Sequence, residues 1–193
     1  MTAEERAALA SQLLQEAGTL LGQTGLFALL QQRYDTVLVT GSAGYDLMVG
    51  RDIDLYLPVE ADAWPEWAGL AGDMARQLQA SGLALHRASF LNDYADPHSL
   101  DAGLYWGIEF RDEAGHLWKC DIWGWDPFDF AVRQARDDSL RVDLARADRD
   151  LILRLKHEAR ACGSEITSFD IYQFAIAGAG TSLAELEAWK GRR

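Results

Sequence analysis

The residues of this chain best suited to chemistry lie between Val37 and Leu57. A short aliphatic run is followed there by a Gly-Ser pair and then by Asp-Ile-Asp, which opens a second apolar run. Successive side chains of a strand point to opposite faces, so Asp52 and Asp54 are expected on one face and the aliphatic residues on the other. Neighbouring carboxylates repel each other and lose hydration, which requires a compensating positive charge. A divalent metal ion would supply it, because hard cations bind carboxylate oxygens.

The Gly-Ser pair, Gly41 and Ser42, predicts a phosphate site. A turn of small residues that opens a helix presents free backbone N–H groups, and such groups attract phosphate. Gly41 lets the backbone approach closely, and Ser42 adds a hydroxyl. Phosphate binding beside metal-binding carboxylates indicates a site for a metal–polyphosphate complex.

A third acid, Asp121, interrupts an otherwise apolar strand predicted over residues 116–123. A buried lone carboxylate is unfavourable unless it is paired or bound to metal. A salt bridge to Lys119 or Arg111 is the alternative to a metal. Glu109, on the preceding predicted strand, is the rival third acid and ranks lower.

Gly41-Ser42, nine intervening residues and then Asp52-Ile53-Asp54 resemble the signature of the nucleotidyltransferase superfamily that includes DNA polymerase beta. The resemblance implies a third acid on a later strand, which Asp121 supplies, and a basic residue directed at the triphosphate from a later helix. Lys156 is the candidate, with a solvated lysine as the alternative. Residues 45–54 and 118–123 also resemble small bacterial nucleotidyltransferase-like proteins. Residues 43–50 depart from the basic or Ser-rich turn that is usual before the acids.

The resemblance implies an α+β fold: a small mixed β-sheet backed by helices, with an N-terminal helix and a C-terminal helical appendage. It implies a Mg-dependent transfer of a nucleoside monophosphate, AMP from ATP being expected, onto a hydroxyl of a small molecule or a protein. Asp52, Asp54 and Asp121 would hold two Mg²⁺ ions, and Gly41, Ser42 and Lys156 would bind the nucleoside triphosphate. The alternative is a catalytically inactive binding or regulatory module of the same fold, such as an antitoxin-like partner protein.

Composition limits the partners. The chain has 193 residues and a formal net charge of −12, which argues against a long nucleic acid, because phosphate binding needs clustered Lys and Arg. The acidic surface favours a cationic acceptor, such as an aminoglycoside-like amine. Two cysteines, Cys120 and Cys162, make no disulfide framework, so a cytoplasmic location is expected. No signal peptide and no membrane-spanning apolar run is recognised, so no membrane partner is expected.

Apolar periodicity and turn residues divide the chain into elements. Helices are expected over residues 2–33 with breaks at Gly18, Gly22 and Gly25, and over 45–48, 60–81, 128–136, 139–161, 168–177 and 182–189. Strands are expected over residues 37–39, 52–57, 83–90, 104–111 and 116–123. Residues 1–127 would form the nucleotidyltransferase core and 128–193 a helical region packed on it. His98 is interpreted as part of a solvated loop.

Overall fold

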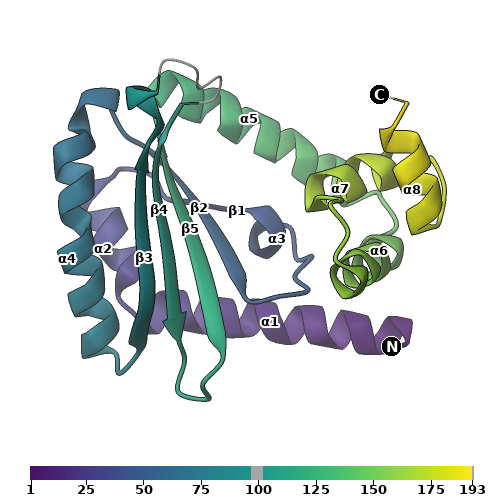
Figure 1. The fold of residues 1–193 in the computed structure, drawn as a ribbon, viewed down its shortest axis with the longest axis horizontal. Helices are drawn as coiled ribbons and strands as arrows, with labels where there is room; N and C mark the ends of the chain where they lie inside the picture. Colours follow the sequence, from purple (N-terminus) through teal and green to yellow (C-terminus); the bar gives the residue numbers. More distant parts are fainter. Residues whose placement is uncertain (97–101, 193) are drawn as a thin grey trace.

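Five strands form one mixed sheet in the computed structural model, which describes residues 1–96 and 102–192 (Figure 1). The strands are β1 (Leu38–Thr40), β2 (Asp52–Pro58), β3 (Ala84–Asn92), β4 (Leu104–Arg111) and β5 (Leu117–Trp125). Their spatial order is β1-β2-β5-β4-β3. Strands β2 and β5 run parallel, whereas the other neighbours are antiparallel. The predicted α+β class with a small mixed sheet is confirmed. His98 lies outside the described residues.

One face of the sheet carries the main hydrophobic core. Alternation along β2 buries Ile53, Leu55 and Leu57, and β5 adds Cys120 and Ile122 beside them. The helices that cover this face are α1 (Ala3–Gln23), α2 (Leu26–Arg33) and α4 (Trp64–Ala80). Figure 1 shows α2 and α4 beside the sheet, while α1 runs beneath it toward the C-terminal helices.

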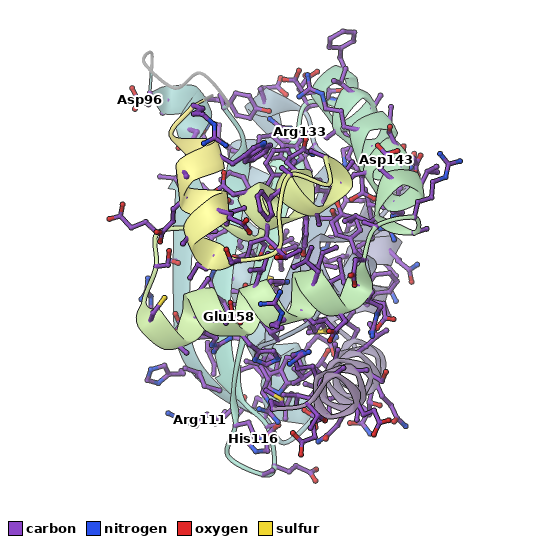
Figure 2. The ribbon with its side chains drawn as sticks, turned by 90° about the vertical axis from the view of Figure 1, so that its right-hand side faces the viewer. Asp96, Arg111, His116, Arg133, Asp143 and Glu158 are labelled. Carbon is purple, nitrogen blue, oxygen red and sulfur yellow. The ribbon has the colours of Figure 1, made fainter. Side chains whose placement is uncertain are left out.

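The C-terminal helices lie on the other side of the sheet. They are α5 (Pro127–Leu144), α6 (Arg149–Cys162), α7 (Ser168–Ile176) and α8 (Leu183–Lys190). Figure 2 views them in front of the strands, with Arg133 and Asp143 on α5 and Glu158 on α6. These helices bury a second apolar cluster, to which the segment after β1 adds Leu47 and α1 adds Ala10. The loop between β1 and β2 is therefore packed against the C-terminal helices.

The N-terminal pair of helices is confirmed, with a correction to its break. Thr2 and Glu5 form a capping box at the start of α1. The helix ends near Gly25, whose φ of 63° is left-handed, whereas Gly18 and Gly22 remain inside α1. A 3-10 turn, η1 (Ala61–Ala63), precedes α4, and another, η2 (Asp93–Ala95), follows β3.

Two predicted helix positions are wrong. The short helix expected over residues 45–48 is instead α3 (Gly41–Gly44), and Asp46 has a left-handed φ of 56° that no helix accommodates. The boundary expected between 136 and 139 does not exist, because Asp137 is buried and hydrogen-bonded inside a continuous α5. The chain breaks after Leu144, and Asp148 caps α6 by accepting from the Leu151 N–H.

Among the described residues, no helix combines the length and the apolar character that crossing a membrane requires.

Candidate active site

Strand pairing brings the three aspartates to one face of the sheet. In the parallel β2–β5 pair, Asp54 is the register partner of Asp121, and Asp52 is the partner of Lys119. Residues in register on neighbouring strands point to the same face, so the acids of both strands share the face opposite the main core. Thr40, at the end of β1, is the register partner of Asp54 on the other side.

Burial and mutual repulsion disfavour the charged forms of the two acids on β2. Burial, together with the charges of Asp52 and Asp121, raises the pKa of Asp54 from 3.8 to about 7. Burial also raises the pKa of Asp52. The charge of Lys119 opposes this rise, whereas the charge of Asp121 adds to it. The site therefore holds negative charge that its own residues compensate only in part.

Asp121 is the best-neutralised member of the three. One carboxylate oxygen pairs with the Lys119 ammonium, and the other accepts a 2.6 Å hydrogen bond from the Tyr105 hydroxyl. Tyr105 reaches Asp121 across Gly107, where a Cβ atom would lie 2.4 Å from the Tyr105 oxygen. Burial and the bond to Asp121 raise the pKa of Tyr105, so this phenol stays neutral and donates. The alternative of a salt bridge between Asp121 and Lys119 is thus present in the structure.

The carboxylates fit a divalent cation by their chemistry. Oδ1 of Asp52 is buried and has no hydrogen-bond partner in the described part of the chain, and a cation would satisfy it. Across residues 1–96 and 102–192, however, no group of three His, Cys, Asp or Glu side chains has its ligand atoms placed to hold a metal ion. Lys119 and Tyr105 occupy the oxygens of Asp121 instead.

Gly41 lies directly beside the Asp54 carboxylate. Gly41 has a left-handed φ of 61°, and a Cβ atom there would lie 1.9 Å from Oδ2 of Asp54. Only glycine fits this position without displacing the carboxylate. Ser42 follows in α3 and is half-buried. The predicted phosphate turn and the Asp-x-Asp pair therefore meet at Gly41.

Lys156 is buried in α6, with 5% of its surface exposed. Its ammonium donates to the Leu47 carbonyl at 2.7 Å and to the Tyr172 hydroxyl at 3.1 Å. Burial lowers the pKa of Lys156 to about 8, against the attraction of Asp54 and Asp52. The sequence alternative of a solvated lysine is therefore wrong, and two of its three N–H donors are engaged by the protein.

Tyr105 is a site residue that the sequence patterns do not reveal. Tyr105 carries no local signal, because its contact with Asp121 depends on the β4–β5 register. The rival acid Glu109 shares the sheet face of Asp121, but it lies 3.6 Å from Arg87 and opposite Lys119.

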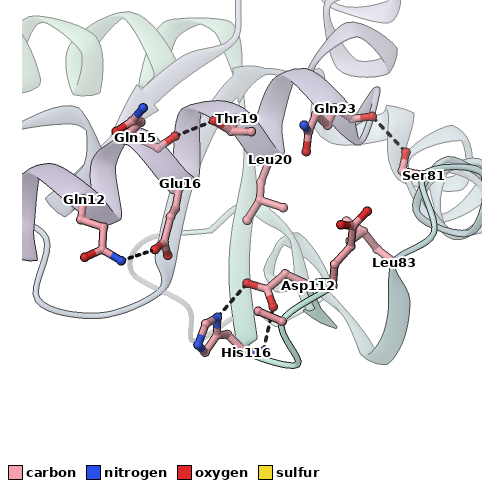
Figure 3. A pocket seen from close by; sticks show the side chains of 12 residues that line it. Gln12, Gln15, Glu16, Thr19, Leu20, Gln23, Ser81, Leu83, Asp112 and His116 are labelled. Carbon is pink, nitrogen blue, oxygen red and sulfur yellow. Dashed lines mark hydrogen bonds and ion pairs between the residues drawn. The ribbon is translucent and has the colours of Figure 1, made fainter.

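A pocket lies apart from these residues, between α1 and the 112–116 turn (Figure 3). Its walls include Gln12, Glu16, Asp112 and His116, and none of the candidate site residues lines it. His116 pairs with Asp112 at 3.1 Å inside this pocket.

Comparison with known proteins finds no matching family model and no matching curated protein. Solved structures do match: Cid1 poly(U) polymerase is 16% identical with a TM-score of 0.44, over 89% of this chain and 53% of that one. A cytoplasmic RNA terminal U-transferase is 17% identical with a TM-score of 0.43, over 81% of this chain and 47% of that one. The structures it resembles are nucleotidyltransferases.

This chain spans about half the length of the nucleotidyltransferase structures that it matches.

Proposed function

We propose that the protein is a Mg-dependent nucleotidyltransferase that moves a nucleoside monophosphate, with AMP from ATP expected, onto a hydroxyl acceptor. The observation that carries the proposal is the parallel register of Asp54 and Asp121, which sets a third carboxylate beside the Asp-x-Asp pair on one face. The buried, unpartnered oxygen of Asp52 supports it, because such an oxygen calls for a cation.

The residues divide the chemistry between them. Asp52, Asp54 and Asp121 would hold the divalent ions, which would lower the pKa of the acceptor hydroxyl and stabilise the charge of the triphosphate. Ser42 and the backbone of Gly41 would contact the outer phosphates. Lys156 is buried and adds positive charge near Asp52 and Asp54.

The transfer forms one bond and breaks one bond at phosphorus. The acceptor oxygen attacks the α-phosphorus, the bond from that phosphorus to the bridging oxygen breaks, and pyrophosphate leaves. The hydroxyl proton goes to a carboxylate, for which we propose Asp121, because it lies on β5 beside Asp54. Asp121 can take that proton only after Lys119 releases its oxygen.

The acceptor is a small molecule or a protein. The net charge of −12 favours a cationic small molecule, such as an aminoglycoside-like amine. A protein acceptor, as for antitoxin-type enzymes, is the other class, and an acceptor panel separates the two.

A second candidate is a non-catalytic binding module with the same fold. The ion pair of Lys119 with Asp121 favours it, because a lysine that permanently neutralises the third acid would remove it from catalysis.

The decisive experiment uses ATP labelled at the α-phosphate, Mg²⁺ and a panel of aminoglycosides and candidate proteins. We expect covalent transfer of label with release of pyrophosphate, lost in Asp52→Asn and kept in the matched surface control Asp35→Asn, since Asp35 is exposed. The proposal would be contradicted if folded wild-type protein transferred no label to any acceptor and Mg-ATP did not raise its melting temperature. Stabilisation by Mg-ATP without transfer to any acceptor would favour the binding module.

A further inference from the structure

We propose that basic residues of the C-terminal helices act as positioning residues, forming a clamp that fixes the turn carrying Gly41 and Ser42. The clamp consists of Arg141 on α5 and of Arg149, Lys156 and Arg160 on α6. Its effect on nucleotide binding rests on the function proposed above. Its effect on the turn does not.

Each clamp residue donates to a backbone carbonyl of β1 or of the segment between β1 and β2. Arg141 bonds the Val39 carbonyl at 2.6 Å and also the Gly44 carbonyl. Arg149 donates to the Asp46 carbonyl at 3.0 Å. Lys156 donates to the Leu47 carbonyl at 2.7 Å, and Arg160 donates to the Val49 carbonyl at 3.4 Å. Five carbonyls within eleven residues thus accept hydrogen bonds from cationic side chains of two helices that are distant in the sequence.

Asp137 holds the first clamp residue in place. It is 5% exposed, and its Oδ2 accepts from Nε of Arg141 at 2.6 Å. Its Oδ1 accepts from the hydroxyls of Thr40 and Tyr45, which flank the Gly41–Gly44 helix on both sides. This buried carboxylate accepts from three donors, one of which is the Arg141 guanidinium, and it thereby ties both ends of the turn to α5.

The turn needs such support because its own backbone is irregular. Gly41 and Asp46 both have left-handed φ angles, of 61° and 56°. Gly44 has no side chain to block Arg141: a Cβ atom there would lie 2.8 Å from the guanidinium. A segment of this kind moves readily unless its carbonyls are bonded.

The clamp acts on the candidate site through Thr40 and Gly41. Thr40 is bonded to Asp137 and is the register partner of Asp54, while Gly41 lies against the Asp54 carboxylate. Loosening the clamp should therefore displace the proposed phosphate turn relative to the acids, without removing any group that touches the nucleotide.

The test combines local hydrogen exchange with nucleotide affinity. Variants Arg141→Gln and Arg141→Lys are compared with Arg154→Gln, a matched control on α6 that also donates to a backbone carbonyl, that of Thr181. We expect both Arg141 variants to speed amide exchange in residues 41–49 by about tenfold and to weaken binding of a non-hydrolysable Mg-ATP analogue by about tenfold. Arg141→Lys keeps the charge but loses the planar, forked donor group of arginine. We therefore expect it to restore neither slow exchange in residues 41–49 nor nucleotide affinity. The control should change neither quantity.

Unchanged exchange in residues 41–49, or exchange that rises evenly over the whole chain, would overturn the clamp. Rescue by Arg141→Lys would overturn the role of the fork. If the turn loosens but the wild-type protein binds no nucleotide, the clamp stands and the proposed function fails. Should the Arg141 variants not fold, Arg149→Gln removes the bond to the Asp46 carbonyl from a partly exposed position and should loosen the same amides about threefold.

Discussion

Protonation of Asp54 should stabilise the metal-free protein, so replacing it by asparagine should raise stability at mildly alkaline pH. The pKa of Asp54 rises from 3.8 to about 7 on folding, because the carboxylate is buried beside Asp52 and Asp121. Between about pH 4 and pH 7 the folded state therefore holds more protons than the unfolded state. The stabilisation is complete below the unfolded pKa and is lost as the pH rises through the folded pKa.

The magnitude follows from the two pKa values. Each pKa unit corresponds to about 1.4 kcal/mol, so a rise from 3.8 to about 7 sets an upper limit of about 4 kcal/mol. Part of this is shared with Asp52 and Asp121, whose charges repel that of Asp54. We expect the free energy of unfolding contributed by Asp54 to fall by about 2–4 kcal/mol from pH 4 to pH 8.

The assay is urea denaturation in EDTA, followed by tryptophan fluorescence, for wild type, Asp54→Asn and the exposed control Asp35→Asn. Differences from wild type at each pH cancel the titration of the groups that do not interact with Asp54. Asp54→Asn should gain stability relative to wild type as the pH rises, while Asp35→Asn should not. Mg²⁺ added at pH 8 should stabilise wild type more than Asp54→Asn. An asparagine variant less stable than wild type at pH 8, or a difference that does not vary with pH, would refute the reasoning.

Three further outcomes are expected. Gly41→Ala should destabilise the protein by about 1–3 kcal/mol in urea denaturation, because of its left-handed φ and its approach to Asp54; a neutral effect would contradict the tight fit. Lys119→Met should lower the melting temperature in EDTA, because Asp121 loses its cation, and Mg²⁺ should restore more of it than in wild type; equal Mg²⁺ responses would count against competition at Asp121. Burial lowers the pKa of Lys156 from 10.5 to about 8, so the unfolded state binds more protons between those values. Stability should therefore rise by about 2–3 kcal/mol from pH 8 to pH 10.5. Lys156→Met should remove that slope in pH-dependent denaturation.

The positions of the three acids could be predicted because strand alternation is a local property. Asp52 and Asp54 sit two residues apart in an apolar run, which places them together whatever the sheet topology. Asp121 was placed in a strand by the same argument. Its register with Asp54 came only from the superfamily resemblance, because sequence periodicity does not reveal which strands are neighbours.

The contacts that tune the site could not be predicted, because they join residues far apart in the chain. Asp137 was expected in a helix break, since its burial depends on Thr40 and Tyr45, which lie more than ninety residues earlier. Lys156 was expected either at the triphosphate or in solvent, and its bond to the Leu47 carbonyl depends on how α6 packs against the turn. The contacts of Asp137 and of Lys156 are therefore set by packing between segments that are distant in the sequence.

The central claim, that Asp52, Asp54 and Asp121 together bind divalent ions, is tested most directly by measuring Mn²⁺ affinity by electron paramagnetic resonance. The measurement uses a non-hydrolysable ATP analogue with wild type, Asp52→Asn, Asp54→Asn and Asp121→Asn. The account predicts nucleotide-dependent Mn²⁺ binding in wild type that weakens at least about tenfold in each variant. Variants that bind Mn²⁺ as tightly as wild type would contradict it.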